Sequence, residues 1–153
     1  MIHPSTFSIV AYDPLENAWG VAVASKFPAV GAVVPWARAN AGAIATQSFA
    51  NTSYGPLGLE MMEHGLTAEM TLEKLLKNDP EYSQRQVGIV DTQGNAVSFT
   101  GQSCYDWAGG LTGVNFAVQG NILVSQSVVE ALADGFSSTG GNLPSRLWHA
   151  LFL

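Results

Sequence analysis

The chain has 153 residues, which suits one domain, and 47% of them are hydrophobic, so we expect a packed core and exclude intrinsic disorder. Charged residues make up only 12%, against about 25% in an average globular domain. The six lysines and arginines are scattered and the net charge is -6. We therefore expect no nucleic-acid or membrane partner, because both require clustered basic residues.

The single cysteine, Cys104, excludes an internal disulfide framework and a cysteine-rich zinc site. The N-terminus lacks the basic and long apolar regions of a signal peptide. The longest apolar run, residues 29–37, is too short to span a bilayer and contains Pro35. We therefore expect a soluble, cytoplasmic protein.

The low charge content also predicts an interface between chains. A chain with few charged groups has little with which to cover its surface in water, so we expect a homo-oligomer such as a dimer. Trp36, Trp107 and Trp148 suit an interface of this kind, although each of them suits a core as well.

The first third of the chain reads as β-strands. A short β-rich run over residues 7–11 ends at the turn signal Asp13-Pro14. Three apolar runs follow, each beginning at a glycine and evenly spaced along the chain: 20–25, 31–36 and 42–47. Their spacing favours antiparallel neighbours, and their nearly continuous small apolar residues favour a sheet covered on both faces.

The hydrophobic period then changes to that of helices. One helix is expected to end near His64-Gly65, and a second is expected to run from an N-cap at Thr67 to the breaker Asn78-Asp79-Pro80. Strands follow at 86–91, 96–100 and 116–119, with residues 109–113 read as a loop. The last two helices are expected at 122–136 and from Leu143-Pro144 onward.

This order is four strands, two helices, three strands and two helices. It predicts an α+β fold with helix, sheet, sheet and helix layers. We expect a tail at residues 1–5 and one domain over 6–153. The apolar end, residues 147–153, has two readings: a terminal helix that packs on the core, or a domain whose closing strands are missing, which would leave a sheet edge unpaired.

Several common catalytic sites have no counterpart in the chain. It lacks a G-x-S-x-G elbow, a phosphate-binding G-x-x-x-x-G-K-[ST] loop and an H-E-x-x-H zinc motif. His3, His64 and His149 do not lie at metal-ligand spacing, and nothing beyond composition supports a triad. Cys104 reads as a small buried apolar residue. We expect neither a metal nor a cofactor.

The N-terminal segment offers a different chemistry. Ser5 and Thr6 lie directly before the first predicted strand. A threonine at a free N-terminus can catalyse acyl transfer with its hydroxyl as nucleophile and its own α-amine as base, and the ordinary pKa of that amine, about 7.7–8.0, suits a base. Lys26, at the end of an apolar run, would depress this pKa if it were buried beside the amine; otherwise it is an exposed residue that closes a strand.

Several motifs, in order, resemble those of one family. They are residues 6–14, 19–27, 30–37, 45–47, 50–51, 53–56, 85–91 and 119–123. This pattern resembles the family catalogued as domain of unknown function 1028, grouped with the N-terminal nucleophile (Ntn) hydrolases, and the resemblance runs from Thr6 to about Leu147. It implies an Ntn-type four-layer αββα sandwich with two mainly antiparallel sheets. Family members continue past the segment that matches 140–153, so the resemblance implies that closing strands are missing.

The resemblance also implies a site. Thr6 would be the nucleophile and Lys26 the residue that tunes it, while polar residues of two segments would line the substrate pocket: Gln47, Asn51, Tyr54, Gln119 and Asn121. The amides of Asn51 and Asn121 would suit an oxyanion hole. Loop and helix capping is the alternative role for both asparagines.

Two functions follow from this reading. The first is an amidohydrolase of Ntn type acting on a small amide or peptide-like substrate. It requires processing between Ser5 and Thr6, or before Ser5, because an amide nitrogen cannot act as a general base. The second is a non-catalytic scaffold that binds a small molecule or assembles as an oligomer.

Overall fold

The structure is a computed structural model that describes residues 4–152. Most of the predicted tail, including His3, lies outside the described residues. The described chain contains two four-stranded sheets, in the orders β2-β1-β8-β7 and β3-β4-β5-β6, and every neighbouring pair is antiparallel. The strands of the first sheet are β1 (Thr6–Asp13), β2 (Ala18–Ser25), β7 (Gly109–Gly113) and β8 (Phe116–Asn121). Those of the second are β3 (Pro35–Arg38), β4 (Gly42–Ser48), β5 (Arg85–Val90) and β6 (Ala96–Thr100).

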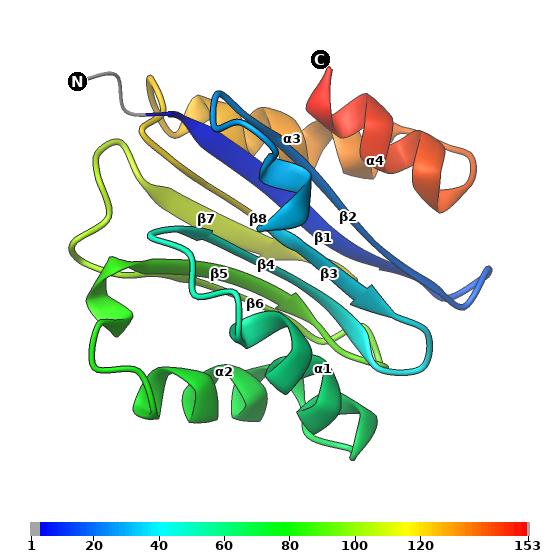
Figure 1. The fold of residues 1–153 in the computed structure, drawn as a ribbon. Coiled ribbons are helices and arrows are strands. Elements are labelled where there is room, and N and C mark those ends of the chain that lie inside the picture. The colour runs from blue at the N-terminus through cyan, green and yellow to red at the C-terminus, as the bar shows by residue number, and fades with distance from the viewer. Residues whose placement is uncertain (1–3, 153) are drawn as a thin grey trace.

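Two helical pairs cover the outer faces of these sheets (Figure 1). Helices α3 (Ser127–Ser138) and α4 (Leu143–Leu151) pack on the first sheet, and α1 (Tyr54–Glu63) and α2 (Ala68–Lys77) pack on the second. The predicted α+β class, with antiparallel sheets and two helical pairs, is confirmed. Within residues 4–152 no helix is long and apolar enough to cross a bilayer.

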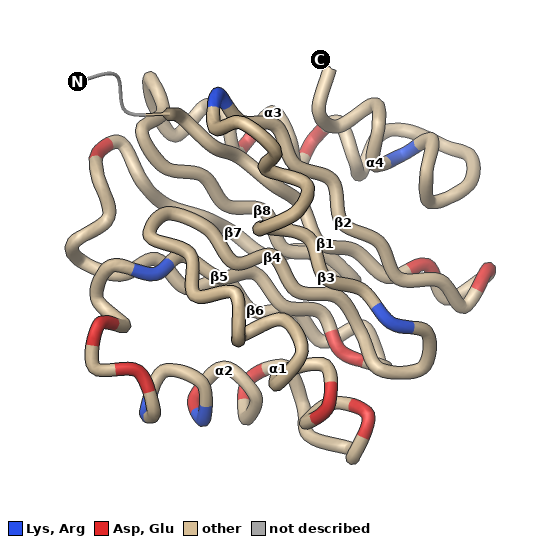
Figure 2. Tube along the Cα trace, in the orientation of Figure 1, with Lys and Arg blue, Asp and Glu red and all other residues tan. Residues whose placement is uncertain are grey.

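Strand β1 shows why the apolar runs carry no clear polar face. Ile9 and Ala11 belong to the core under α3 and α4, whereas Val10, between them in sequence, belongs to the core between the two sheets. Since successive side chains of a strand point to opposite faces, a strand covered on both sides must be apolar at nearly every position. Figure 2 shows the consequence: the charged residues lie mainly on helices and near strand ends.

The predicted strand over 31–36 is wrong in its first half. Residues Val30–Ala32 form a short 3-10 helix, and β3 begins only at Pro35. Ala29 takes a left-handed conformation with φ 59° and starts the turn, which is closed by a hydrogen bond from Val33 N to Val30 O. The branched apolar residues of this segment predict a strand. The turn that forms instead places Val30 and Val33 over one end of the sheets.

Two further boundaries differ from the prediction. Residues 109–113, read as a loop, form strand β7, because pairing with β8 orders a glycine-rich segment of low intrinsic strand preference. The third helix begins at Ser127 and not at residue 122. Ile122 has φ 56°, and its N–H donates to Tyr105 O at 3.1 Å, so the chain turns away from β8 before the helix starts.

The tryptophans divide between core and surface. Trp36 and Trp107 are half-buried and pack against the helix-covered cores, whereas Trp148 is 67% exposed and lies against the ring of Phe152. The interface role expected for these residues stays a prediction.

Gly55, on the buried face of α1, allows close packing of that helix. A Cβ atom added there would overlap the indole ring of Trp36. Alanine is ordinarily favoured over glycine in helices by about 1 kcal/mol. Because of the overlap with Trp36, we expect Gly55→Ala instead to lower the free energy of unfolding by about 1–3 kcal/mol. Urea denaturation measures the loss.

The matched control is Gly31→Ala, because a Cβ atom at Gly31 would have no neighbour within 4 Å. We expect it to change the free energy of unfolding by less than about 0.5 kcal/mol. Equal stabilities of the two variants would contradict this account of the contact between α1 and Trp36.

Candidate functional site

A pocket of about 510 Å³ opens at one end of the two sheets. The pairing register explains its position: Thr6 at the start of β1 lies opposite Ser25 and Asn121, while Ser48 at the end of β4 lies opposite Arg85. The ends of five strands, β1, β2, β4, β5 and β8, therefore converge on one edge. The apolar part of the lining is contributed by Phe27, Val30, Val33, Val34, Phe49 and Ile122.

Thr6 lies in this pocket and is 6% exposed. Its Oγ1 is 2.7 Å from Ser25 Oγ and donates a longer hydrogen bond, 3.4 Å, to Pro4 O. The main-chain nitrogen of Thr6 is an amide here, joined to Ser5, whose carbonyl accepts from Lys26 N at 3.2 Å. The hydroxyl is therefore held by neighbours, and the base that an N-terminal threonine needs becomes free only when the bond between Ser5 and Thr6 is cleaved.

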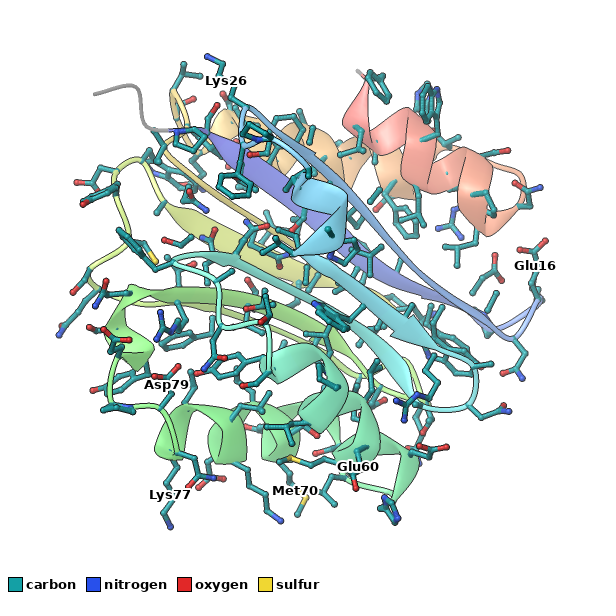
Figure 3. The ribbon with its side chains drawn as sticks, in the orientation of Figure 1. Glu16, Lys26, Glu60, Met70, Lys77 and Asp79 are labelled. Atoms are coloured by element: carbon teal, nitrogen blue, oxygen red, sulfur yellow. The ribbon has the colours of Figure 1, made fainter. Side chains whose placement is uncertain are left out.

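Lys26 does not line the pocket. Lys26 is exposed, and Figure 3 shows its side chain directed away from the sheets at the turn after β2. The neighbouring residue Ser25 contacts Thr6 instead. Water screens a charge in such a position, so a tuning role for Lys26 stays a prediction that requires its side chain to turn inward.

A buried polar network between the sheets fixes the two amides that reach the pocket, Gln47 and Asn121. Gln86 Oε1 accepts from Gln47 Nε2 at 2.8 Å and from Asn121 Nδ2 at 2.9 Å. Gln86 Nε2 in turn donates to Gly120 O at 2.8 Å. The sequence analysis does not predict Gln86 as a site residue. The signal for it is a polar side chain at the first position of an otherwise apolar predicted strand, because a buried polar group needs hydrogen-bond partners.

Ser8 and Gln119 complete this network. Ser8 Oγ donates to Gln47 Oε1 at 2.7 Å and accepts from Gln119 Nε2 at 2.7 Å. Gln119 is fully buried between the sheets and does not line the pocket, so it supports the site from behind. Of the predicted polar residues, Gln47 and Asn121 reach the pocket with Thr6.

Removing the Ser8 hydroxyl tests the network. Ser8 is 0% exposed, so Ser8→Ala removes the hydroxyl that donates to Gln47 Oε1 and the closer of the two acceptors of Gln119 Nε2. We expect the free energy of unfolding to fall by about 1–3 kcal/mol, measured by urea denaturation. Ser137→Ala, at an exposed position of α3, is the control and should change it by less than about 0.5 kcal/mol; an unchanged Ser8→Ala protein would contradict the network.

Asn51 and Tyr54 lie beside the pocket in a second buried cluster, centred on Asp79. Asp79 Oδ2 accepts from Arg85 Nε at 2.8 Å, from Tyr54 Oη at 2.8 Å and from Asn51 Nδ2 at 3.0 Å. Asn51 Oδ1 also accepts from the backbone of Ser53, before α1. Neither Asn51 nor Tyr54 lines the pocket. The contacts of Asn51 fit the loop role considered for it, whereas the N-cap of α1 is Ser53.

The cluster shifts the pKa values of its members. The hydrogen bond from Arg85 holds the pKa of the Asp79 carboxyl well below its usual value. Burial, helped by the hydrogen bond to Asp79, raises the pKa of Tyr54 well above 10. Arg85 Nη1 also donates to Phe49 O at 2.7 Å, so this charge pair fixes the loop that forms one pocket wall.

Among residues 4–152, no group of three or more His, Cys, Asp or Glu is placed to hold a metal ion. His64 and His149 are exposed and lie outside the pocket lining. Cys104 is buried against the carbonyls of Gln84 and Arg85, as its apolar reading predicts. The pocket therefore brings together a threonine hydroxyl, two amides and an apolar wall.

Residues 6–153 match a family of unknown function, DUF1028. The chain belongs to this family. The crystal structure of protein SPO2555 from Silicibacter pomeroyi, which carries the same family designation, resembles the chain with a TM-score of 0.92 at 32% sequence identity. The match covers 96% of this chain and 68% of that one. No curated protein matches the chain.

Membership of DUF1028 confirms the family resemblance carried by the motifs. Thr6, Gln47, Arg85 and Asn121, which line the pocket, all lie within the matched residues. The family description and the related crystal structure specify no reaction, so the chemistry has to be argued from the pocket itself.

Proposed function

We propose that the chain is an amide hydrolase of Ntn type, with Thr6 as its nucleophile and the pocket at Thr6 as its substrate site. The observation that carries this proposal is the placement of a buried threonine hydroxyl at the first position of β1, inside a pocket of about 510 Å³. The layers of two helix-covered antiparallel sheets support the Ntn assignment of the fold.

The proposed reaction begins once the bond between Ser5 and Thr6 has been hydrolysed, which frees the α-amine of Thr6. Thr6 Oγ attacks the carbonyl carbon of the substrate amide, and its proton passes to the α-amine. The C–N bond breaks, and the leaving amine takes that proton. Water then hydrolyses the threonine ester, releasing a carboxylic acid and restoring the hydroxyl.

Asn121 is the residue that the proposal assigns to the oxyanion. One N–H of Nδ2 is bound to Gln86, and among the described residues the other has no partner. A donor held in place before the reaction costs no reorganisation when negative charge develops. Gln47 is a poorer donor, because its amide is spent on Gln86, Ser8 and the carbonyl of Gln119.

The test is hydrolysis of the p-nitroanilide of 4-phenylbutanoic acid by protein that begins at Thr6. We expect release of p-nitroaniline and, after rapid acid quenching, a 4-phenylbutanoyl group on the peptide containing Thr6. Acylation of another residue, or release no faster than in buffer, would contradict the proposal.

The alternative is a binding scaffold without catalysis. The position of Lys26, exposed and outside the pocket lining, favours it. In protein that retains residues 1–5, Thr6 also has no amine to accept its proton. Protein with this bond intact should bind ligands in the same pocket without acylation, and the anilide assay on that form separates the two functions.

A further inference from the structure

Among the described residues that line the pocket, no side chain offers an unpaired charge. Arg85 is the one charged residue among the described lining residues, and all three of its nitrogens are engaged. Nε donates to Asp79, Nη1 donates to Phe49 O and Nη2 donates to Glu81 at 2.9 Å. A ligand carboxylate would find this guanidinium already neutralised by two carboxylates.

Of the two amides in the pocket lining, Asn121 is the one with unspent hydrogen-bonding capacity. Its Nδ2 gives one hydrogen to Gln86 Oε1, and within residues 4–152 its Oδ1 accepts no hydrogen bond. Asn121 therefore presents one donor and one acceptor side by side on a neutral group. A carboxamide carries the complementary acceptor and donor in the same arrangement.

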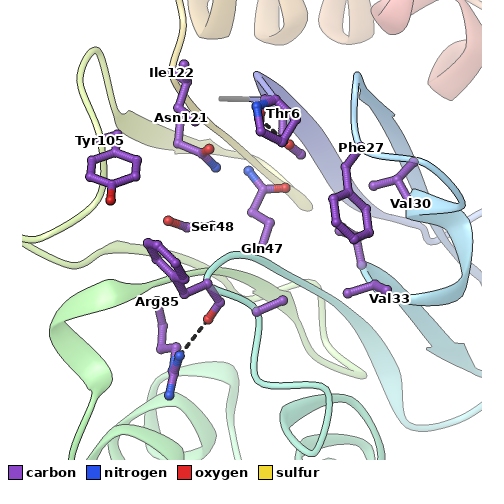
Figure 4. Close-up of a pocket in the computed structure, with 14 residues that line it drawn as sticks. Thr6, Phe27, Val30, Val33, Gln47, Ser48, Arg85, Tyr105, Asn121 and Ile122 are labelled. Atoms are coloured by element: carbon purple, nitrogen blue, oxygen red, sulfur yellow. Dashed lines mark hydrogen bonds between the residues drawn. The ribbon is translucent and has the colours of Figure 1, made fainter. Parts of the chain in front are cut away.

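Apolar side chains surround the amide of Asn121. Figure 4 shows Phe27, Val30 and Val33 on one side of the pocket and Tyr105 on the other, with Asn121 and Gln47 between them. A charged group that entered would lose its hydration without gaining a counter-charge, which is costly in an apolar site. An uncharged ligand with an apolar arm loses little and buries apolar surface.

We propose that the Thr6 pocket selects an uncharged carboxamide with an apolar arm and rejects the carboxylate and the ammonium of the same shape. This inference rests on the proposed function in taking the Thr6 pocket as the substrate site, and it adds the charge and the shape of the substrate. Asn121 is the residue that recognises the carboxamide.

The test compares 4-phenylbutanamide, 4-phenylbutanoate and 4-phenylbutylamine binding to the full chain by titration calorimetry. A pH of about 9 keeps any freed Thr6 amine neutral, since its ordinary pKa is about 7.7–8.0. We expect the amide to bind at least about tenfold more tightly than either charged compound. No binding of the amide, or equal affinity for one of the charged compounds, would overturn the inference.

Two variants locate the preference. Asn121→Ala should weaken amide binding about tenfold and leave 4-phenylbutanoate unchanged, whereas Gln102→Ala, which removes an exposed amide outside the lining, should change neither. If Asn121→Ala does not fold, Val30→Asp tests the same inference, because it places a negative charge on the half-buried wall of the pocket. In this variant 4-phenylbutylamine should bind more tightly than 4-phenylbutanamide. An unchanged preference in the folded variant would overturn the inference.

Binding and turnover separate this inference from the proposed function. Preference for the amide without hydrolysis of the anilide would overturn the hydrolase and leave the pocket selectivity standing. Hydrolysis by Thr6 combined with equal binding of charged and uncharged compounds would leave the hydrolase standing and overturn the selectivity.

Discussion

Thr6→Ala is expected to lower the rate of anilide hydrolysis by about 10³-fold or more, because it removes the attacking atom itself. Thr6→Ser keeps a hydroxyl at the same position and should retain measurable turnover. The α-amine of residue 6 is present in both variants, so the difference between them reports the hydroxyl alone. Release of p-nitroaniline, followed in the steady state, measures both rates.

Thr112→Ala is the matched control, since Thr112 is exposed on β7 and lies outside the pocket lining. Its rate should stay within about twofold of the parent protein, as for a substitution at the surface. Thermal melting curves show whether Thr6→Ala is folded. A folded Thr6→Ala protein with full activity would exclude Thr6 as the nucleophile.

Asp79→Ala is expected to lower the free energy of unfolding by about 3–5 kcal/mol, because it leaves the guanidinium of Arg85 buried without its partner. The Asp79 and Arg85 side chains are only 5% and 10% exposed. The same substitution removes the acceptor for Tyr54 and Asn51. Urea denaturation at neutral pH measures the loss.

The control is Glu63→Gln, which breaks the ion pair between Arg38 and Glu63. That pair is similar in length, 2.7 Å, but its side chains are 44% and 50% exposed. Its loss should cost less than about 1 kcal/mol. Equal costs for the buried and the exposed pair would contradict the role assigned to Asp79.

The pH dependence follows from the same cluster. Because the pKa of Asp79 is lowered in the folded state, its contribution is present above the pKa of the unfolded chain, about 3.9, and is lost as the pH falls further. The urea midpoint of the parent protein should therefore fall as the pH is lowered below about 4, toward the folded-state pKa of Asp79, and it should fall less steeply in Asp79→Ala. The raised pKa of Tyr54 acts oppositely and removes stability above about pH 10.

Local patterns predicted most of the elements. Thr67 caps α2 by accepting from Met70 N at 3.2 Å, and Pro144 lies in the first turn of α4, both as expected. These signals depend on neighbours in sequence. The strand expected over 31–36 is wrong at 31–34, where a left-handed turn begins at Ala29, and the loop expected over 109–113 is a strand that pairs with the next strand along the chain, β8.

Part of the site, near strand ends, could be predicted from the sequence, and the rest could not. Thr6, Gln47 and Asn121 lie at, or within two residues of, the ends of strands that the sequence indicated. The register of β1 and β8 pairs Thr6 with Asn121, and Gln47 reaches the same pocket from the second sheet. The pairing of Asp79 with Arg85 was not visible, because Asp79 sits in a helix-breaking segment and reads there only as a turn residue. The exposed position of Lys26 also depends on how the turn after β2 folds, which no local pattern describes.

The most direct test of the central claim is the identity of the N-terminal residue of protein that hydrolyses the anilide, read from its intact mass and its terminal peptide. The proposal predicts a chain that begins at Thr6, lighter than the full chain by the mass of residues 1–5. Active protein in which the bond between Ser5 and Thr6 is intact would contradict it, because Thr6 would then act without its amine.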